Sequence, residues 1–257
     1  MENVFSNVSK EKLLLTLDSY LNKNDCASAE KYLKERMNEA EKNADTPILF
    51  LVFNELMGLY RKLGRKDDAL YFVNLTLELI EREKLDGSVG AATALLNCAT
   101  VHKAFSMPES SIALFERAKK IYEAELDEND ERFGGLYNNM ALTLVDLERF
   151  REAEALYEKA LELAKSTKQG ELSSAMTYLN MASAAECELG LCDADEKIQL
   201  FLKKAEEMLE KYKIRDGYYA FVCDKCASVF LYYGHFLYAN ELKRRSETIY
   251  KRGNGEE

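Results

Sequence analysis

Three short, nearly identical segments recur along this chain at almost equal intervals. They are LNCA at 96–99, NNMA at 138–141 and LNMA at 179–182. Their asparagines Asn97, Asn139 and Asn180 follow one another after 42 and 41 residues, and an alanine stands two positions after each. A period of roughly 20 to 50 residues is typical of proteins built from stacked repeats. The sequence is therefore expected to fold as an array of similar units.

The composition indicates that the repeated unit is helical. Only two prolines occur among 257 residues, and Ala, Leu, Glu and Lys dominate. These residues tolerate helix interiors well, whereas strict alternation of apolar and polar residues over strand lengths is hard to find. We interpret the chain as all-α.

The clearest unit is YNNMALTLVDLERFREAEALYEKALELA at 137–164. It resembles the tetratricopeptide repeat, which has an aromatic residue, Leu-Gly and Tyr on a first helix, and Ala, an aromatic residue and Ala on a second. The matching residues are Tyr137, Met140, Ala141, Leu144, Ala153, Tyr157 and Ala160. The small Ala141 and Ala153 allow two helix backbones to approach closely.

Laid along the chain, this template gives six units within one predicted domain, 1–257. The units span approximately 10–46, 47–86, 87–128, 129–169, 170–214 and 215–252. The packing position on the second helix is occupied by Ala29, Ala69, Ser111, Ala153, approximately Ile198, and Ala239. The fifth unit has about four extra residues around Cys192 to Asp195, and its second helix is placed on that basis.

The turn inside each unit carries residues that commonly end helices. These turns are Asn24-Asp25, Gly64-Arg65, Met107-Pro108, Glu148-Arg149, Gly190-Leu191 and Gly234-His235. The resemblance implies twelve main helices in antiparallel pairs, about three quarters of the chain in helix, stacked as a right-handed superhelical solenoid.

The period of 40 to 45 residues is longer than the family's usual 34, and no unit has the family's tryptophan or closing proline. This long period, the Asn-Asn-Met-Ala segment and the acidic linker LDENDERFGG resemble the kinesin light chain subtype of the repeat. The resemblance covers nearly all of residues 10–252 and implies a concave groove that binds proteins or peptides.

In this repeat family the groove is lined by side chains of the first helices. The candidate peptide-binding residues are Asn54, Asn97, Thr100, Lys103, Asn138, Asn139, Asn180, Ser183, Asp224 and Ser228. Asn97, Asn139 and Asn180 would form a ladder whose amides bond the backbone of an extended peptide. Alternatively, these amides bond a neighbouring helix and fix the register of the repeats.

The charges expected in the groove are mixed. The basic residues are Arg61, Lys62, Lys103 and Lys225, and the acidic ones are Glu11, Asp18, Glu55, Asp146, Glu186 and Asp224. Kinesin light chain repeats present a basic groove to acidic cargo, and this sequence departs from that pattern. It also lacks the Lys, Asn and Arg cluster of the family's carboxylate clamp.

No metal, cofactor or enzyme motif is predicted. Cys223 and Cys226 lack a second ligand pair and fall at packing positions of a first helix, so we interpret them as buried thiols. LDENDERFGG has Arg132 where a calcium loop needs Gly and Asn138 where it needs Glu, which favours a solvated linker. His102, at the place of the packing tyrosine, and His235, in a turn, have ordinary structural roles. No P-loop, His-Glu-x-x-His, Gly-x-Ser-x-Gly or dinucleotide fingerprint occurs.

The overall charge limits the partners. A net charge of −10 opposes binding to nucleic acid or anionic lipid, and no apolar run is long enough to cross a bilayer. The N-terminus shows no secretory signal, and the six irregularly placed cysteines do not resemble a secreted disulfide framework. We therefore expect a cytoplasmic protein that contacts neither membrane nor nucleic acid.

Three functions remain open at this point. The first is a non-catalytic scaffold that binds a protein or peptide in the groove. The second is a homo-oligomeric structural module, assembled through the aromatic sixth unit or the leucine-rich KEKLLLTLDSYL at 10–21. The third is a sensor of a regulatory peptide, similar to bacterial pheromone receptors.

Overall fold

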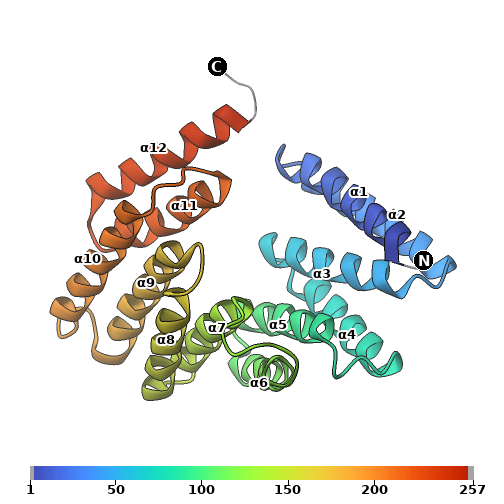
Figure 1. The fold of residues 1–257 in the computed structure, drawn as a ribbon, viewed down its shortest axis with the longest axis horizontal. Helices are drawn as coiled ribbons and strands as arrows, with labels where there is room; N and C mark the ends of the chain where they lie inside the picture. The colour runs from blue at the N-terminus through green and yellow to red at the C-terminus, as the bar shows by residue number, and fades with distance from the viewer. Residues whose placement is uncertain (1–2, 254–257) are drawn as a thin grey trace. The chain divides into compact units, whose positions relative to one another are not determined.

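The structure is a computed structural model that describes residues 3–253 of the chain, with side chains described for residues 10–252. Twelve α-helices and no strand occur in this described part, of which 81% is helical (Figure 1). The all-α fold of twelve helices predicted from the repeats is confirmed.

The chain divides into two compact units, Met1–Asp127 and Glu128–Glu257, and the division lies beside the predicted boundary between the third and fourth repeats. The first unit holds α1 (Asn3–Leu21), α2 (Cys26–Lys42), α3 (Thr46–Lys62), α4 (Lys66–Arg82), α5 (Val89–Ala104) and α6 (Pro108–Glu125). The second holds α7 (Arg132–Asp146), α8 (Phe150–Ala164), α9 (Gly170–Leu189), α10 (Asp195–Lys211), α11 (Gly217–Tyr232) and α12 (Phe236–Gly253).

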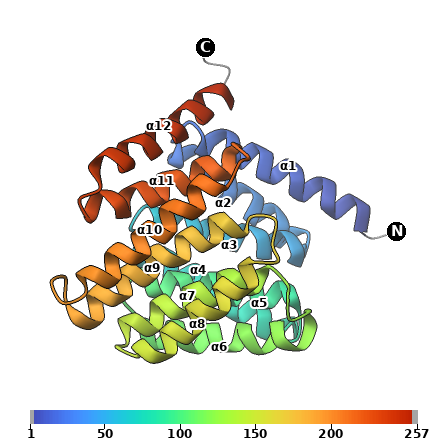
Figure 2. The same cartoon turned by 60° about the vertical axis from the view of Figure 1, so that its left-hand side comes forward.

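Within each unit, successive helices form antiparallel pairs, and neighbouring pairs pack side by side (Figure 2). The predicted packing residue is the fourth residue of the second helix in every pair, and it is at most 1% exposed. Ile198 takes this place in α10, as predicted. Ser111 takes it in α6, where its hydroxyl donates a hydrogen bond to the Ala99 carbonyl over 2.8 Å. Small side chains at this position let the paired backbones approach closely.

The structure has a turn at or next to each of the six predicted places, and each turn contains a residue with positive φ; in the third unit that residue is Ser106, one position before the predicted Met107-Pro108. These residues are Asn24, Gly64, Ser106, Glu148, Gly190 and Gly234. At five of them the next backbone N–H donates to a carbonyl five residues earlier, as in the bond from Arg149 to Leu144 over 2.8 Å. This pattern satisfies carbonyls that a helix end would leave unpaired. Gly190 differs, because the extra residues of the fifth unit form a turn at 191–194 before α10 begins.

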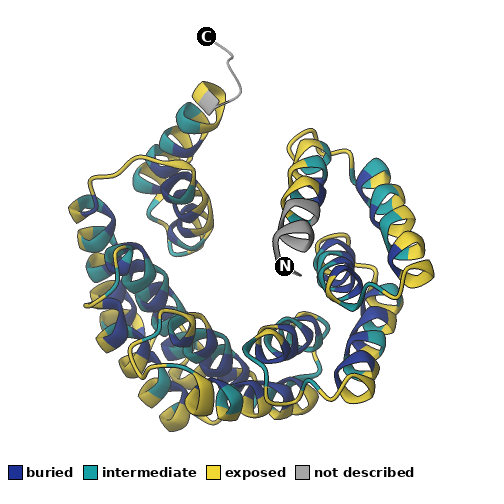
Figure 3. Cartoon of the chain, turned by 45° about the vertical axis from the view of Figure 1, so that its right-hand side comes forward, coloured by how far each residue is buried: buried dark blue, intermediate teal, exposed yellow. Residues whose placement is uncertain are grey.

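Side chains on the faces where helices meet form the core, and the opposite faces are exposed (Figure 3). Cys223 and Cys226 lie in this core at 0% and 1% exposure, and burial raises the pKa of both thiols. The aromatic residues of the sixth repeat are divided between the two environments. Tyr219 and Phe230 are fully buried, whereas Tyr232 and Phe236 are 67% and 60% exposed.

Within the described residues, no helix combines the length and the hydrophobicity needed to cross a membrane.

Candidate functional site

The structure places every predicted binding residue on the first helix of a pair. Asn54 lies on α3; Asn97, Thr100 and Lys103 on α5; Asn138 and Asn139 on α7; Asn180 and Ser183 on α9; and Asp224 and Ser228 on α11. The residues on α3, α5, α7 and α9 are half-buried, whereas Asp224 and Ser228 are exposed. All these polar residues therefore lie on the first helices of the pairs, but their contacts differ.

In the first unit, Asn97 bonds the first helix of the preceding repeat. Its Nδ2 donates to Oδ1 of Asn54 over 2.9 Å, although the two residues are 43 positions apart. Asn54 in turn donates its Nδ2 to the Phe50 carbonyl over 2.7 Å. One amide pair thus joins α3 to α5, a contact that the register interpretation predicts.

Beside this pair lies the acidic Glu55 of α3. Burial raises the pKa of Glu55, and the negative charge of Asp18 on α1 raises it further. Asp18 itself is exposed. This part of the first unit therefore offers carboxylates, as the predicted groove charges imply.

In the second unit, a similar pair joins α7 to α9. Asn180 donates its Nδ2 to Oδ1 of Asn138 over 3.2 Å. Asn138 donates to the Gly134 carbonyl over 3.1 Å and to the Thr177 hydroxyl over 3.0 Å. Both N–H groups of the Asn138 amide are therefore used inside the protein.

The predicted three-membered ladder needs a correction, because Asn139 has a different role from Asn97 and Asn180. Asn139 donates to the Gly135 carbonyl of its own helix over 2.8 Å. Asn138, one position earlier, is the residue that accepts from the next repeat. The equal spacing in sequence does not produce equal contacts, because a one-residue step on a helix turns a side chain by about 100°.

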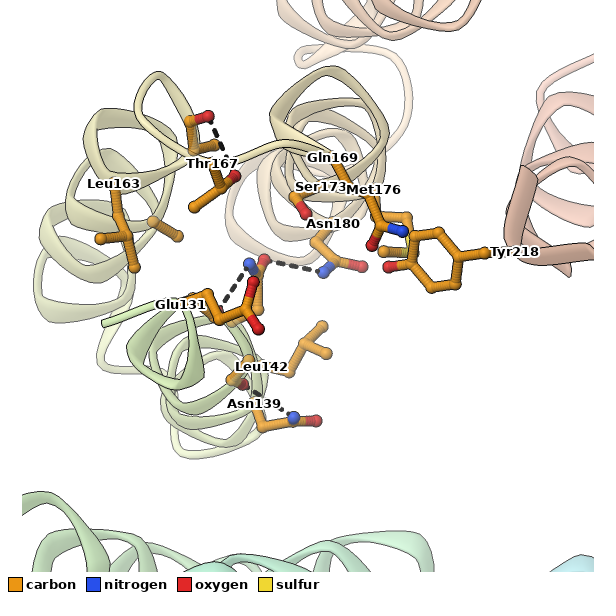
Figure 4. A pocket seen from close by; sticks show the side chains of 15 residues that line it. Glu131, Asn139, Leu142, Leu163, Thr167, Gln169, Ser173, Met176, Asn180 and Tyr218 are labelled. Atoms are coloured by element: carbon orange, nitrogen blue, oxygen red, sulfur yellow. Dashed lines mark hydrogen bonds between the residues drawn. The ribbon is translucent and has the colours of Figure 1, made fainter. Parts of the chain in front are cut away.

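Asn138, Asn139 and Asn180 line a pocket of about 420 Å³ in the second unit, which we call the amide pocket. Figure 4 shows its walls, which come from α7, the end of α8, the start of α9 and Tyr218 of α11. Leu142, Leu163 and Met176 add apolar surface, and Ser173 and Gln169 add polar groups. A concave site of this size with a few convergent polar groups is typical of small-ligand or side-chain binding.

Tyr218 reaches from α11 toward α9 at one side of the amide pocket (Figure 4). Burial raises the pKa of its hydroxyl, an effect that an interaction with Ser173 opposes. Tyr218 therefore stays protonated at neutral pH and presents an uncharged hydroxyl and an aromatic ring.

Two glycines, Gly134 and Gly135, line the pocket, and a third, Gly170, lies beside the lining residue Gln169; sequence reasoning missed all three. Gly134 and Gly135 lie in the first turn of α7, and their carbonyls accept hydrogen bonds from the side chains of Asn138 and Asn139. At Gly170, where α9 begins, a Cβ would lie 1.8 Å from the Ala164 carbonyl oxygen. The adjacent pair Gly134-Gly135 at a helix start is a signal that could have pointed to this wall.

The predicted groove residue Glu186, also on α9, is hydrogen-bonded within the protein. Its carboxylate accepts hydrogen bonds from the Tyr232 and Tyr233 hydroxyls, both over 2.7 Å. These bonds join the fifth repeat to the sixth, so Glu186 contributes to repeat packing.

Comparisons with known proteins agree with this geometry. A sequence model described as the tetratricopeptide repeat matches residues 135–167, which contain most of the amide pocket's α7 and α8 residues. No curated protein matches the chain by sequence.

Several solved structures share the fold. BtubC (BKLC) from P. vanneervenii has a TM-score of 0.67 at 20% identity, over 79% of this chain and 82% of that one. The TPR-like repeats of a putative kinesin light chain from Podosopora anserina give 0.50 at 15%, over 78% and 94%. The apo form of the quorum sensor NprR from B. thuringiensis gives 0.55 at 17%, over 92% of this chain but 63% of the sensor.

The helix pairs and their packing positions define an all-α array of helix pairs, and the segment at 135–167 matches a tetratricopeptide repeat. The solved structures that share this fold include the TPR-like repeats of a putative kinesin light chain, the subtype that the long period resembles.

Proposed function

We propose that this chain is a non-catalytic scaffold that binds a peptide or protein segment against its first helices, with the amide pocket as the main anchoring site. The cytoplasm as its place of action is part of the same proposal. The observation that carries it is the convergence of three sequence-predicted asparagines, Asn138, Asn139 and Asn180, on one pocket.

The fold supports a binding role, because stacked helix pairs generally present surfaces for protein and peptide partners. The amide pocket supports a peptide, because Asn139 and Asn180 each have a carbonyl oxygen and one N–H beyond the hydrogen bonds described above. Such groups match the donors and acceptors of an extended main chain.

Selection of random peptides against the intact protein tests the proposal. A recovered peptide should bind wild type, and Gly135→Phe should weaken its binding at least about tenfold, because the new ring would occupy the pocket. A Cβ at Gly135 meets nothing within 4 Å among the described residues, so the first atom of the new side chain fits beside the present backbone.

Gly90→Phe is the matched control, since Gly90 lies in the first turn of α5 in the other unit and its Cβ space is also open. It should leave the affinity unchanged. A folded Gly135→Phe protein that binds as tightly as wild type would contradict the assignment of the pocket.

A homo-oligomeric module is a second candidate function, favoured by one observation. Leu237, Tyr232 and Phe236 are 89%, 67% and 60% exposed near the α11–α12 turn. Light scattering at several concentrations tests it, with Leu237→Glu expected to abolish any concentration-dependent increase in mass.

A further inference from the structure

We propose that the amide pocket takes a cationic side chain of the bound segment, and arginine in preference to lysine. This inference rests on the proposed function, since it specifies which peptides the pocket would select.

The orientations of the pocket amides follow from their fixed partners. Main-chain carbonyls only accept hydrogen bonds, so Nδ2 of Asn138 must face Gly134 and Nδ2 of Asn139 must face Gly135. Oδ1 of Asn138 then faces Asn180, which must donate its own Nδ2.

Donors remain at the pocket, namely one N–H each of Asn139 and Asn180 and the amide of Gln169, but the acceptor sites outnumber them. Asn139 and Asn180 keep their Oδ1 atoms outside the hydrogen bonds of the described residues, while Asn138 has used both of its N–H groups. The Glu131 carboxylate at the mouth adds two further acceptor oxygens (Figure 4). A guanidinium group complements such a site, because it carries five N–H donors and no acceptor.

The charge of the pocket also favours a cationic side chain. Among the described residues that line it, Glu131 is the one charged side chain. Its sequence neighbour Arg132 is held by Asp130, with Nη2 to Oδ2 at 2.6 Å. Lys165 pairs with Glu162, and Lys168 does not line the pocket. An anionic side chain would meet the Glu131 carboxylate without a cation in the lining to offset it.

The remaining walls suit the rest of an arginine side chain. Leu142, Leu163 and Met176 offer apolar surface to its methylene groups. The ring of Tyr218 lies at the side of the pocket, where a planar guanidinium can stack on an aromatic face. Lysine has the same charge but lacks the planar guanidinium group with its several N–H donors, so it should bind more weakly than arginine.

Nuclear magnetic resonance titration of the intact, ¹⁵N-labelled protein tests the inference. The probes are capped Ala-Ala-X-Ala-Ala peptides in which X is Arg, Lys, Gln or Glu. The arginine peptide should shift the side-chain amide signals of Asn139 and Asn180 and bind about two- to fivefold tighter than the glutamine peptide, with glutamate weakest. Added salt should reduce the advantage of arginine.

Glu131→Gln should remove that advantage, and Glu128→Gln should not, because Glu128 is in the same linker but does not line the pocket. Equal binding of the arginine and glutamine peptides at the pocket would overturn the inference and leave peptide binding standing. Preference for glutamate, or an arginine advantage that survives Glu131→Gln, would also overturn it. Failure of all four peptides to shift the pocket signals would count against both proposals.

Discussion

Asn180 donates its side-chain amide to Oδ1 of Asn138 over 3.2 Å, across a separation of 42 residues in sequence. The bond joins the first helices of two successive repeats, and both residues also line the amide pocket. The same side chains therefore hold the repeats together and shape the surface proposed to bind a ligand. Stability and binding are coupled at this point, and a variant that tests one must be measured for the other.

Asn180→Ala should destabilise the protein, because it leaves Oδ1 of Asn138 without its donor. The expected cost is about 0.5–1.5 kcal/mol of unfolding free energy, measured by urea denaturation. Asn139→Ala is the matched control and should cost less, since the amide of Asn139 bonds within its own helix. If the two variants are equally stable, the pair does not fix the register.

Gly170→Ala should also destabilise the protein, since the new Cβ would lie 1.8 Å from a backbone oxygen that cannot move independently. We expect a loss of about 1–3 kcal/mol. Gly135→Ala should have the opposite sign, with a gain of up to about 1 kcal/mol, because its Cβ meets nothing within 4 Å and alanine favours helix. Thermal unfolding of both variants checks the prediction, and a stable Gly170→Ala protein would refute it.

Ala153→Asp should cost several kcal/mol, because Ala153 is 1% exposed where α7 and α8 meet, and the new carboxylate would have no partner. Ala155→Asp adds the same group two residues away on the exposed face of α8 and should change stability by less than about 0.5 kcal/mol. The melting temperatures of the two variants, measured under the same conditions, test this prediction. Similar values for both would mean that the predicted packing position at Ala153 is wrong.

His102 should make the protein less stable in mild acid. Burial lowers the pKa of His102 below its usual 6.5, and its buried Nδ1 has no hydrogen-bond partner among the described residues. The unfolded chain therefore binds the proton more readily, and stability is lost as the pH falls from about 6.5 toward the folded pKa. His102→Leu, which copies Leu144 of the next repeat, should flatten the stability curve between about pH 7 and pH 5.5. An unchanged curve would exclude His102 as the cause.

The helices, their pairing and their turns were predictable because each depends on local chemistry that recurs with the period. The residue four places into each second helix must fit between two backbones, so even Ile198 could be placed after an insertion. Left-handed turns were equally visible at Gly64 and Gly234. Ser106, by contrast, shows no such signal, and its turn begins one residue before the predicted Met107.

The contacts of the candidate site were only partly predictable. Sequence places Asn138 and Asn139 on the same helix, but it does not say which of them faces the next repeat, since that depends on how two helices cross. The amide pocket also depends on Tyr218, which a different repeat contributes, and the start of α9 beside it requires Gly170 because of a carbonyl six residues earlier. Such contacts follow from packing between segments, and no local pattern encodes them.

The thiols have a practical consequence for measuring how the chain opens. Cys98 is buried in the first compact unit, where burial raises its pKa to about 12. Cys223 and Cys226 are buried in the second unit. Cys187 and Cys192 are exposed. Alkylating reagents attack thiolates that reach solvent, so the buried thiols react only when their surroundings unfold. Peptide mapping after a timed exposure to the reagent would therefore give a separate opening rate for each unit. The exposed Cys187 and Cys192 would give the reference rate of a freely accessible thiol in the same sample.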